Sequence, residues 1–142
     1  PDHVKGTPWP HPSRVEEPTT TRARQFIICA DWNTCHQNID LKNWRPNRKH
    51  SGFMPHEREW LDRIYDKLGW VDIFREITDQ PELYTWWSNR GQAWANNVGW
   101  RLDYMLVTPG LSGSGLGQSI YREERFSDHA PLVIDFDIPQ PF

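Results

Sequence analysis

Three short apolar segments of this chain each carry an acidic residue at one end, and this pattern limits the folds and the chemistry open to it. The segments are CADWN (residues 29–33), GWRLDY (residues 99–104) and FSDHAP (residues 126–131). Strands packed in one domain bring together side chains that are far apart in the sequence. We therefore expect one site built from three separate stretches.

The apolar pattern predicts a mixture of strands and helices. Residues 26–30 lack polar alternation, which is typical of a strand buried on both faces. Pro55 suits the first turn of a helix whose apolar positions continue to Leu68 and whose end is marked by Gly69. Residues 71–77 are expected to form another short helix.

Other segments alternate with turns and loops. Residues 34–53 are interpreted as a long loop. The glycine-rich residues 112–117 are interpreted as a flexible turn and not as a phosphate loop, because no helix with a lysine follows. The mixture of element types predicts an α/β or α+β domain. Four further strands are expected, at residues 84–87, 99–107, 119–121 and 132–136.

The length favours a single domain, and the net charge provides no overall electrostatic attraction to nucleic acid. The 142 residues can bury one core, and the formal net charge of −3 leaves DNA contacts to local basic patches. Cys29 and Cys35 match neither a disulfide framework nor a zinc site, which favours a reduced, cytoplasmic protein. No apolar run approaches 18 residues, so we expect no membrane partner.

Residues 1–24 differ from the rest of the chain. They hold five of the twelve prolines and have no helical or strand period. We interpret them as an irregular arm, with a disordered leader as the alternative, and residues 25–138 as the folded domain.

Carboxylates, an amide and a histidine supply the groups that phosphodiester hydrolysis requires. Each cluster alone has an ordinary explanation, since Asp31 and Asn33 could form a turn and His129 could lie in one. Asp103 lies inside a strand pattern and needs a partner, because an unpaired buried charge is costly. His129 is available as that partner, and the three clusters together are more specific than any one.

Five segments resemble the carboxyl half of the exonuclease III / AP endonuclease family, in the family's order, over about residues 25–137. They are IICADWNTCHQNIDLKNW, GFMPHEREWL, GWVDIFRE, YTWWSNRGQAWANNVGWRLDYMLVTPGL and RFSDHAPLVIDFD. The SDHAP block is shared by the wider endonuclease/exonuclease/phosphatase superfamily, and the other blocks point to its DNA-repair branch. The resemblance implies half of a four-layer α/β sandwich, with one mixed, largely antiparallel sheet and flanking helices.

The resemblance implies a role for each residue of the expected site. Asp31 would position or deprotonate the attacking water, and Asn33 would hold the scissile phosphate or the metal. Asp103 would orient His129, which would bind the phosphate and stabilise its charge in the transition state. Asp128 would contribute to a Mg²⁺ site, with Mn²⁺ as the alternative metal.

The resemblance also implies residues that bind double-stranded DNA. Trp86 and Trp100 would form a pocket for a flipped abasic sugar, with ordinary core packing as the alternative. A second group of residues would contact DNA phosphates: Lys42, Arg45, Asn47 and Lys49. The alternative for this group is a solvated basic loop.

The chain departs from the family in length and at two positions. The family's domain is about twice as long, and no segment here matches its amino half, which holds a metal-site glutamate and a tyrosine. Ala30 replaces a glycine and His56 a glutamate. We therefore expect an incomplete metal site, weak activity, and an exposed apolar sheet face. That face would favour an amino-half partner or self-association.

The favoured function is metal-dependent hydrolysis of the phosphodiester bond 5′ to an abasic site, with 3′-5′ exonuclease or 3′ phosphatase activity at 3′ ends. One alternative is another phosphoesterase of the superfamily that acts on a small phosphate or a lipid head group. A fragment that folds without catalysing a reaction is a second alternative. A tryptophan-rich carbohydrate-binding module is a third, but it leaves the three acid-bearing segments unexplained.

Overall fold

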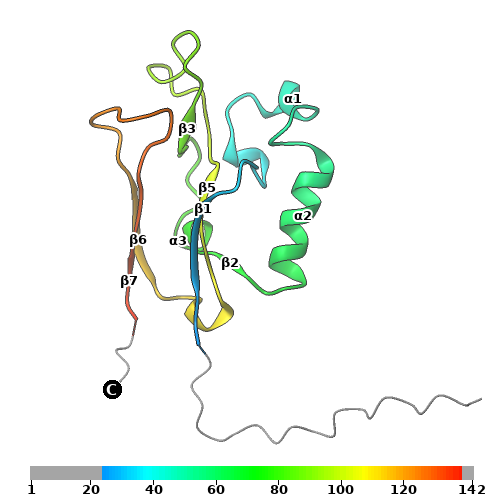
Figure 1. The fold of residues 1–142 in the computed structure, drawn as a ribbon, viewed down its shortest axis with the longest axis vertical. Coiled ribbons are helices and arrows are strands. Elements are labelled where there is room, and N and C mark those ends of the chain that lie inside the picture. Colours follow the sequence, from blue (N-terminus) through cyan, green and yellow to red (C-terminus); the bar gives the residue numbers. More distant parts are fainter. Residues whose placement is uncertain (1–23, 139–142) are drawn as a thin grey trace, which may run out of the picture.

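The computed structural model describes residues 24–138, which form three parts lying side by side (Figure 1). The central part is an antiparallel sheet in which β5 (Asp103–Val107) lies between β1 (Ile27–Asp31) and β2 (Val71–Asp72). The arm expected over residues 1–24 lies outside the described residues apart from Arg24.

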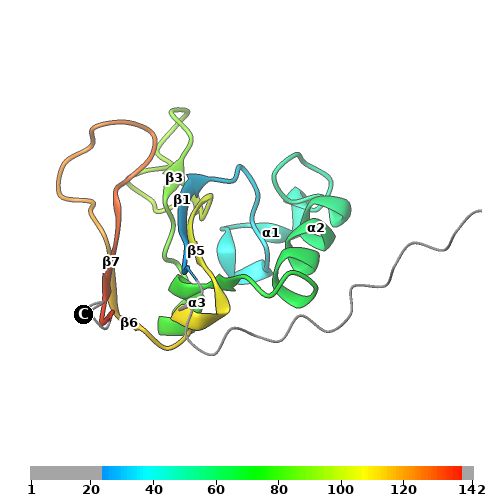
Figure 2. The same cartoon turned by 60° about the horizontal axis from the view of Figure 1, so that its bottom comes forward.

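A hairpin of β6 (Gly115–Ile120) and β7 (Leu132–Phe136) forms the second part. Helix α3 (Ile73–Ile77) packs between this hairpin and the central sheet, and its buried side chains join the core there (Figure 2). The strand expected over residues 132–136 is confirmed. The helix expected over residues 71–77 begins later than predicted, because its first two residues pair with β5 as β2.

The flexible turn expected over residues 112–117 is wrong in its second half, because the chain pairs with β7 from Gly115 onward. A Cβ atom at Gly115 would lie 2.7 Å from Cδ1 of Ile77. Glycine at this position therefore allows α3 to approach the strand closely. The single-turn helix η2 (Pro109–Leu111) connects β5 to this hairpin.

Helix α2 (Pro55–Asp66) forms the third part and covers one face of the central sheet. Pro55 occupies its first turn as expected, and the Glu57 carboxylate accepts hydrogen bonds from the N–H groups of Met54 and Gly52, both at 2.8 Å. The helix ends just before Gly69, whose φ of +76° takes the left-handed conformation.

The strand expected over residues 99–107 is interrupted. Its first part, β4 (Gly99–Trp100), pairs with β3 (Trp86–Trp87), and the second part is β5 in the central sheet. The interruption falls at Arg101, whose side chain is fully buried and hydrogen-bonds to Asp40 and Asp72. These two carboxylates therefore fix the side chain at the point where the strand is interrupted.

The long loop expected over residues 34–53 contains two short helices, η1 (Asn38–Asp40) and α1 (Trp44–Asn47). The Asp40 carboxylate stabilises the first by accepting the N–H groups of His36 and Gln37. A buried acid therefore organises a segment whose sequence has no clear period.

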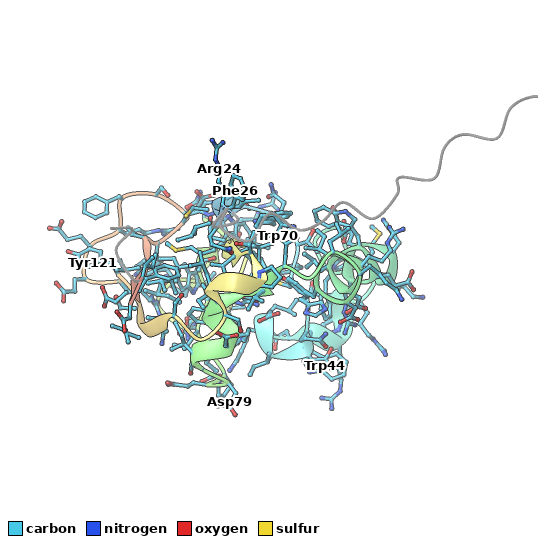
Figure 3. The ribbon with its side chains drawn as sticks, turned by 90° about the horizontal axis from the view of Figure 1, so that it is seen from below. Arg24, Phe26, Trp44, Trp70, Asp79 and Tyr121 are labelled. Carbon is cyan, nitrogen blue, oxygen red and sulfur yellow. The ribbon has the colours of Figure 1, made fainter. Side chains whose placement is uncertain are left out.

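The first apolar strand is not buried on both faces, and this expectation was wrong. Phe26 is 54% exposed, and all five residues of β1, an edge strand of the sheet, are exposed. Figure 3 shows Phe26 next to Arg24 at the periphery of the molecule. In the same part of the chain, no helix combines the length and apolar character that crossing a membrane requires.

Candidate active site

Two carboxylates meet at one end of the central sheet. Asp31 is the last residue of β1 and Asp103 is the first residue of β5, and the antiparallel register makes them direct partners. Cross-strand partners on a sheet lie within about 5.5 Å of one another. The register that pairs the apolar residues of the two strands therefore also places both acids at the same end of the sheet.

His129 joins these two carboxylates. Its Nδ1 lies 2.8 Å from Oδ2 of Asp103, and its Nε2 lies 3.8 Å from Oδ2 of Asp31. The stretch that carries it is fixed by a bridge between His129 and Trp86. The structure thus brings three of the predicted site residues together from three separate segments.

The charge state of His129 depends on these neighbours. Partial burial lowers the pKa of the imidazole, but the hydrogen bond and charge of Asp103 and the charges of Asp31 and Asp128 outweigh it. The net effect raises the pKa above 6.5. The site therefore favours the protonated ring more than water does.

Asn33 lies beside Asp31, and its backbone N–H donates to Oδ1 of that carboxylate at 2.8 Å. Its φ of +52° is left-handed, a conformation that asparagine adopts more readily than most residues. The same turn is anchored by a hydrogen bond from the N–H of Trp32 to the carbonyl of Leu102, which directly precedes β5. The turn holds Asn33 at the rim of a neighbouring pocket.

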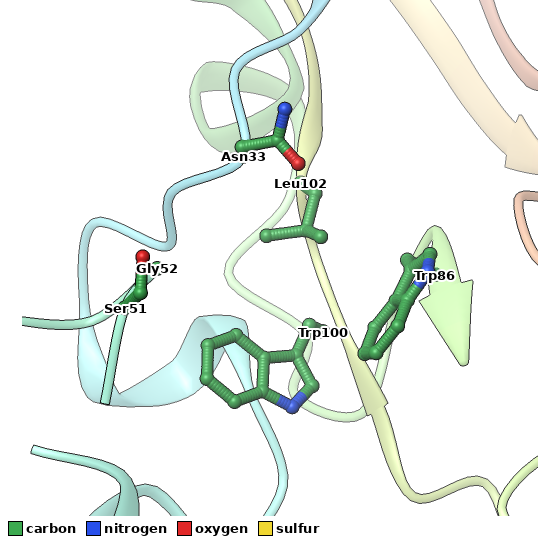
Figure 4. A pocket seen from close by; sticks show the side chains of 6 residues that line it. All are labelled: Asn33, Ser51, Gly52, Trp86, Trp100 and Leu102. Carbon is green, nitrogen blue, oxygen red and sulfur yellow. The ribbon is translucent and has the colours of Figure 1, made fainter. Parts of the chain in front are cut away.

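This pocket has a volume of about 400 Å³ and opens next to Asn33 (Figure 4). The rings of Trp86 and Trp100 form its aromatic walls, with centroids 6.4 Å apart and planes at 88°. Leu102, Ser51 and Gly52 complete the lining. Both tryptophans predicted for a pocket line this one, and both also pack against a buried apolar cluster, so their role in binding a sugar stays a prediction.

Three of the lining residues were not predicted. Leu102 lies between Trp100 and Asp103 in the sequence, and that position was an available signal. Gly52 has no sequence signal for a pocket, although its role is steric. A Cβ atom there would lie 3.0 Å from Cζ3 of Trp100, so glycine lets the loop approach the ring. Ser51 adjoins it.

The predicted metal residue Asp128 lies next to the pocket wall. Its Oδ2 accepts a hydrogen bond from Nε1 of Trp86 at 3.0 Å. Within residues 24–138, no group of three or more histidine, cysteine, aspartate or glutamate side chains is arranged to hold a metal ion. Because Mg²⁺ is commonly held by one or two carboxylates together with water and substrate phosphates, the role of Asp128 as a metal donor stays a prediction.

The predicted phosphate-contact residues lie on and around α1, and several are engaged within the protein. Lys42 forms an ion pair with Glu82. The Arg45 guanidinium lies 4.9 Å from the centroid of the Trp44 ring, and Asn47 donates from Nδ2 to a backbone carbonyl at 2.9 Å. Lys49 is exposed. The four side chains share one surface loop without converging on one point.

A buried ionic cluster supports the pocket and was not predicted. Oδ1 of Asp40 accepts from Nε of Arg101 at 2.8 Å and from Nη2 of Arg75 at 2.8 Å. The backbone N–H of Arg101 also donates to the carbonyl of Asp40 at 2.7 Å, and Leu41 bridges Trp100. The cluster therefore fixes the strand that carries one pocket wall.

Known proteins share both the sequence and the fold of this chain. The exodeoxyribonuclease of Bacillus subtilis is 41% identical over 116 residues, which cover 81% of this chain and 46% of that protein. The DNA repair nuclease APEX1 of Danio rerio is 39% identical over 112 residues, which cover 78% and 36%. The structure of an AP endonuclease from Archaeoglobus fulgidus matches with a TM-score of 0.74 and 29% identity, over 80% of this chain and 46% of that one.

These matches confirm the predicted α/β class, in a superfamily whose AP endonucleases form four-layer α/β sandwiches. The chain spans less than half the length of each of these three proteins. The model of the Endonuclease/Exonuclease/phosphatase family matches residues 2–129, which include all three acid-bearing segments up to His129. The chain therefore belongs to the Endonuclease/Exonuclease/phosphatase family.

Proposed function

We propose that this chain carries phosphate-cleaving and substrate-binding groups of a DNA-repair nuclease. Its reaction would be hydrolysis of the phosphodiester bond 5′ to an abasic site in double-stranded DNA, with 3′-5′ exonuclease or 3′ phosphatase activity at 3′ ends. One observation carries the proposal: the row Asp31–His129–Asp103 lies beside a pocket walled by two tryptophans. The names of the Bacillus and Danio relatives support it.

The geometry supports a division of tasks in the row. His129 hydrogen-bonds to Asp103 through Nδ1, so its Nε2 is directed to a phosphoryl oxygen and neutralises charge there. Asp31 faces the same Nε2 at 3.8 Å, and its carboxylate accepts the proton of the attacking water. Asn33 orients the phosphate through its side-chain amide.

The pocket supports selection of an abasic nucleotide. Its aromatic walls, Trp86 and Trp100, accept a bare deoxyribose turned out of the helix. A sugar that still carries its base is larger, and the rings exclude it sterically. Lys42, Arg45, Asn47 and Lys49 lie on one loop and provide contacts to the DNA backbone, which position the substrate without reading its sequence.

A divalent cation, Mg²⁺ or Mn²⁺, is part of this proposal, with the Asp128 carboxylate as one donor. The tasks assigned above use only the protein's own groups. A second candidate is a chain that binds abasic DNA but does not cleave it, and it is favoured by the fact that the chain spans less than half the length of its relatives.

Cleavage of an end-labelled duplex with one abasic site tests the proposal, with an undamaged duplex and an inositol phosphate as comparison substrates. We expect slow cleavage at the abasic site with Mg²⁺ that stops with EDTA and in Asp31→Asn and His129→Gln. DNA binding without cleavage would favour the second candidate. Equal hydrolysis of the inositol phosphate would favour a general phosphoesterase and contradict the proposal.

A further inference from the structure

The hydroxyl of Thr85 lies at the gap between strands β4 and β5. Thr85 is fully buried and directly precedes β3. Its Oγ1 accepts two backbone hydrogen bonds, from the N–H of Leu102 at 3.0 Å and from the N–H of Asp103 at 3.1 Å. A single side-chain oxygen thus satisfies one buried and one partly buried amide at the gap between the two strands.

The backbone of Thr85 connects the other two parts of the site. Its N–H donates to the carbonyl of Trp100 at 3.0 Å, and its carbonyl accepts the N–H of Ala130 at 2.8 Å. Ala130 follows His129 directly. Thr85 therefore contacts the pocket wall, the start of β5 and the histidine stretch at once, although it touches none of the reacting groups itself.

We propose that Thr85 is a positioning residue whose hydroxyl oxygen fixes Asp103 against His129. The oxygen holds the amide of Asp103, and the carboxylate on the same residue holds Nδ1 of His129 at 2.8 Å. The catalytic consequence of this inference rests on the proposed nuclease function. Its structural consequence, an intact Asp103–His129 hydrogen bond, does not.

A packing role for the Thr85 methyl group is the competing explanation, and two substitutions separate it from the proposal. Thr85→Val keeps the shape of the side chain but removes the oxygen, whereas Thr85→Ser keeps the oxygen and removes the methyl group. Thr108→Val is the matched control. Its Oγ1 also accepts a backbone N–H, from Phe26 at 3.0 Å, but at the opposite end of β5.

The first measurement needs no DNA. The proton of the His129 Nδ1–H group, hydrogen-bonded to Asp103, is followed by ¹H NMR and assigned through its loss in Asp103→Asn. We expect Thr85→Val to lose this resonance or shift it upfield, and Thr85→Ser and Thr108→Val to keep it. If Thr85→Val does not fold, Thr85→Ala removes the same oxygen with less crowding and is compared in the same way.

The second measurement is the rate of abasic-site cleavage. We expect kcat of Thr85→Val to fall by about 10- to 100-fold with KM within about twofold, because a displaced pair binds substrate but reacts slowly. Thr85→Ser should retain most of kcat. An unchanged resonance and kcat in Thr85→Val would overturn the inference. An equal loss of the resonance and of kcat in Thr85→Val and Thr85→Ser would also overturn it. If the unsubstituted chain does not cleave DNA, the proposed function fails, and the resonance alone decides the inference.

Discussion

At the scale of single residues, the two nitrogens of His129 meet different surroundings. Nδ1 is occupied by Asp103 at 2.8 Å, whereas Nε2 lies 3.8 Å from Asp31, beyond hydrogen-bond distance. A phosphoryl oxygen or a water can therefore compete for Nε2 while the ring stays oriented. The raised pKa of His129 keeps a proton available for that contact.

Replacing Asp103 by asparagine is expected to lower the pKa of His129, because the charge is lost while the burial that disfavours the imidazolium remains. The folded-state pKa lies above the unfolded value of 6.5, so this pair stabilises the fold below that pH. The stabilisation is lost as pH rises through the folded pKa. NMR titration of the His129 ring measures the shift, with Asp135→Asn on β7 as the control. An unchanged pKa in Asp103→Asn would contradict the assigned cause.

The Asp40 carboxylate is expected to make the stability of the fold depend on pH in the acidic range. Burial alone raises the pKa of its carboxyl, yet Arg101 and Arg75 lower it from 3.8 to about 2. The contribution of this carboxylate to the free energy of unfolding is therefore present above pH 3.8 and lost as pH falls through about 2. Asp40→Asn removes one of the two carboxylates that pair with the buried Arg101, which keeps Asp72, and we expect a loss of about 1.5–3 kcal/mol near neutral pH.

Urea unfolding at several pH values measures this effect. The stability difference between the Asp40→Asn variant and the unsubstituted protein should shrink by about 2 kcal/mol as pH falls from 3.8 to about 2. Asp66→Asn at the exposed end of α2 is the control and should show no comparable change. A pH-independent difference would show that Asp40 acts through its shape and not through its charge.

At the scale of elements, α2 holds the central sheet from the face opposite the β6–β7 hairpin (Figures 1 and 2). Its buried Leu61 and Ile64 pack on Tyr104 and Leu106 of β5. The Tyr104 hydroxyl donates to the carbonyl of Thr34 at 2.7 Å, in the turn that follows Asn33. The helix therefore supports the strand that begins with Asp103.

Leu61→Ala is expected to destabilise the protein by about 2–5 kcal/mol, because the side chain is fully buried and leaves a cavity. Leu68→Ala is the matched control. Leu68 is 68% exposed just beyond the same helix, and its change should stay within about 0.5 kcal/mol. Urea denaturation curves for both variants measure the difference, and equal losses would show that α2 does not anchor the sheet.

At the scale of the whole molecule, β1 forms one of the two edges of the central sheet within residues 24–138. The exposed apolar side chains Ile27 and Ile28 lie on β1, and exposed Phe26 directly precedes it. Exposed edges and apolar patches favour pairing with another chain. The predicted self-association, or binding of an amino-half partner, remains a prediction that this surface supports.

Sedimentation velocity over a concentration series tests self-association. We expect the unsubstituted protein to associate as concentration rises and the double variant Ile27→Lys and Ile28→Lys to remain monomeric, because charges on an edge strand oppose pairing. Leu116→Lys is the control, since Leu116 is 69% exposed on β6, away from that edge. A monomer at all concentrations would contradict the prediction.

The sequence by itself determined the elements with a strong local signal, and it singled out Asp31, Asp103 and His129, which the structure brings together. Pro55 and Gly69 delimit α2, the apolar run of β7 has the predicted bounds, and Asp103 required a partner that proved to be His129. These inferences succeed because they depend on periodicity, turn chemistry and the cost of an unpaired charge. Periodicity and turn chemistry act within a few residues, and an acid in a strand requires a partner of opposite charge or a hydrogen-bond donor.

Only the tertiary structure decided where the strand over residues 99–107 breaks, how the pocket closes, and that β1 is exposed. Arg101 lies at the break, and its partner Asp40 is 61 residues away. The pocket depends on Gly52 approaching Trp100, and the exposure of β1 depends on which strands lie beside it. Each of these is a long-range contact, and no local pattern encodes the position of a partner that is distant in the sequence.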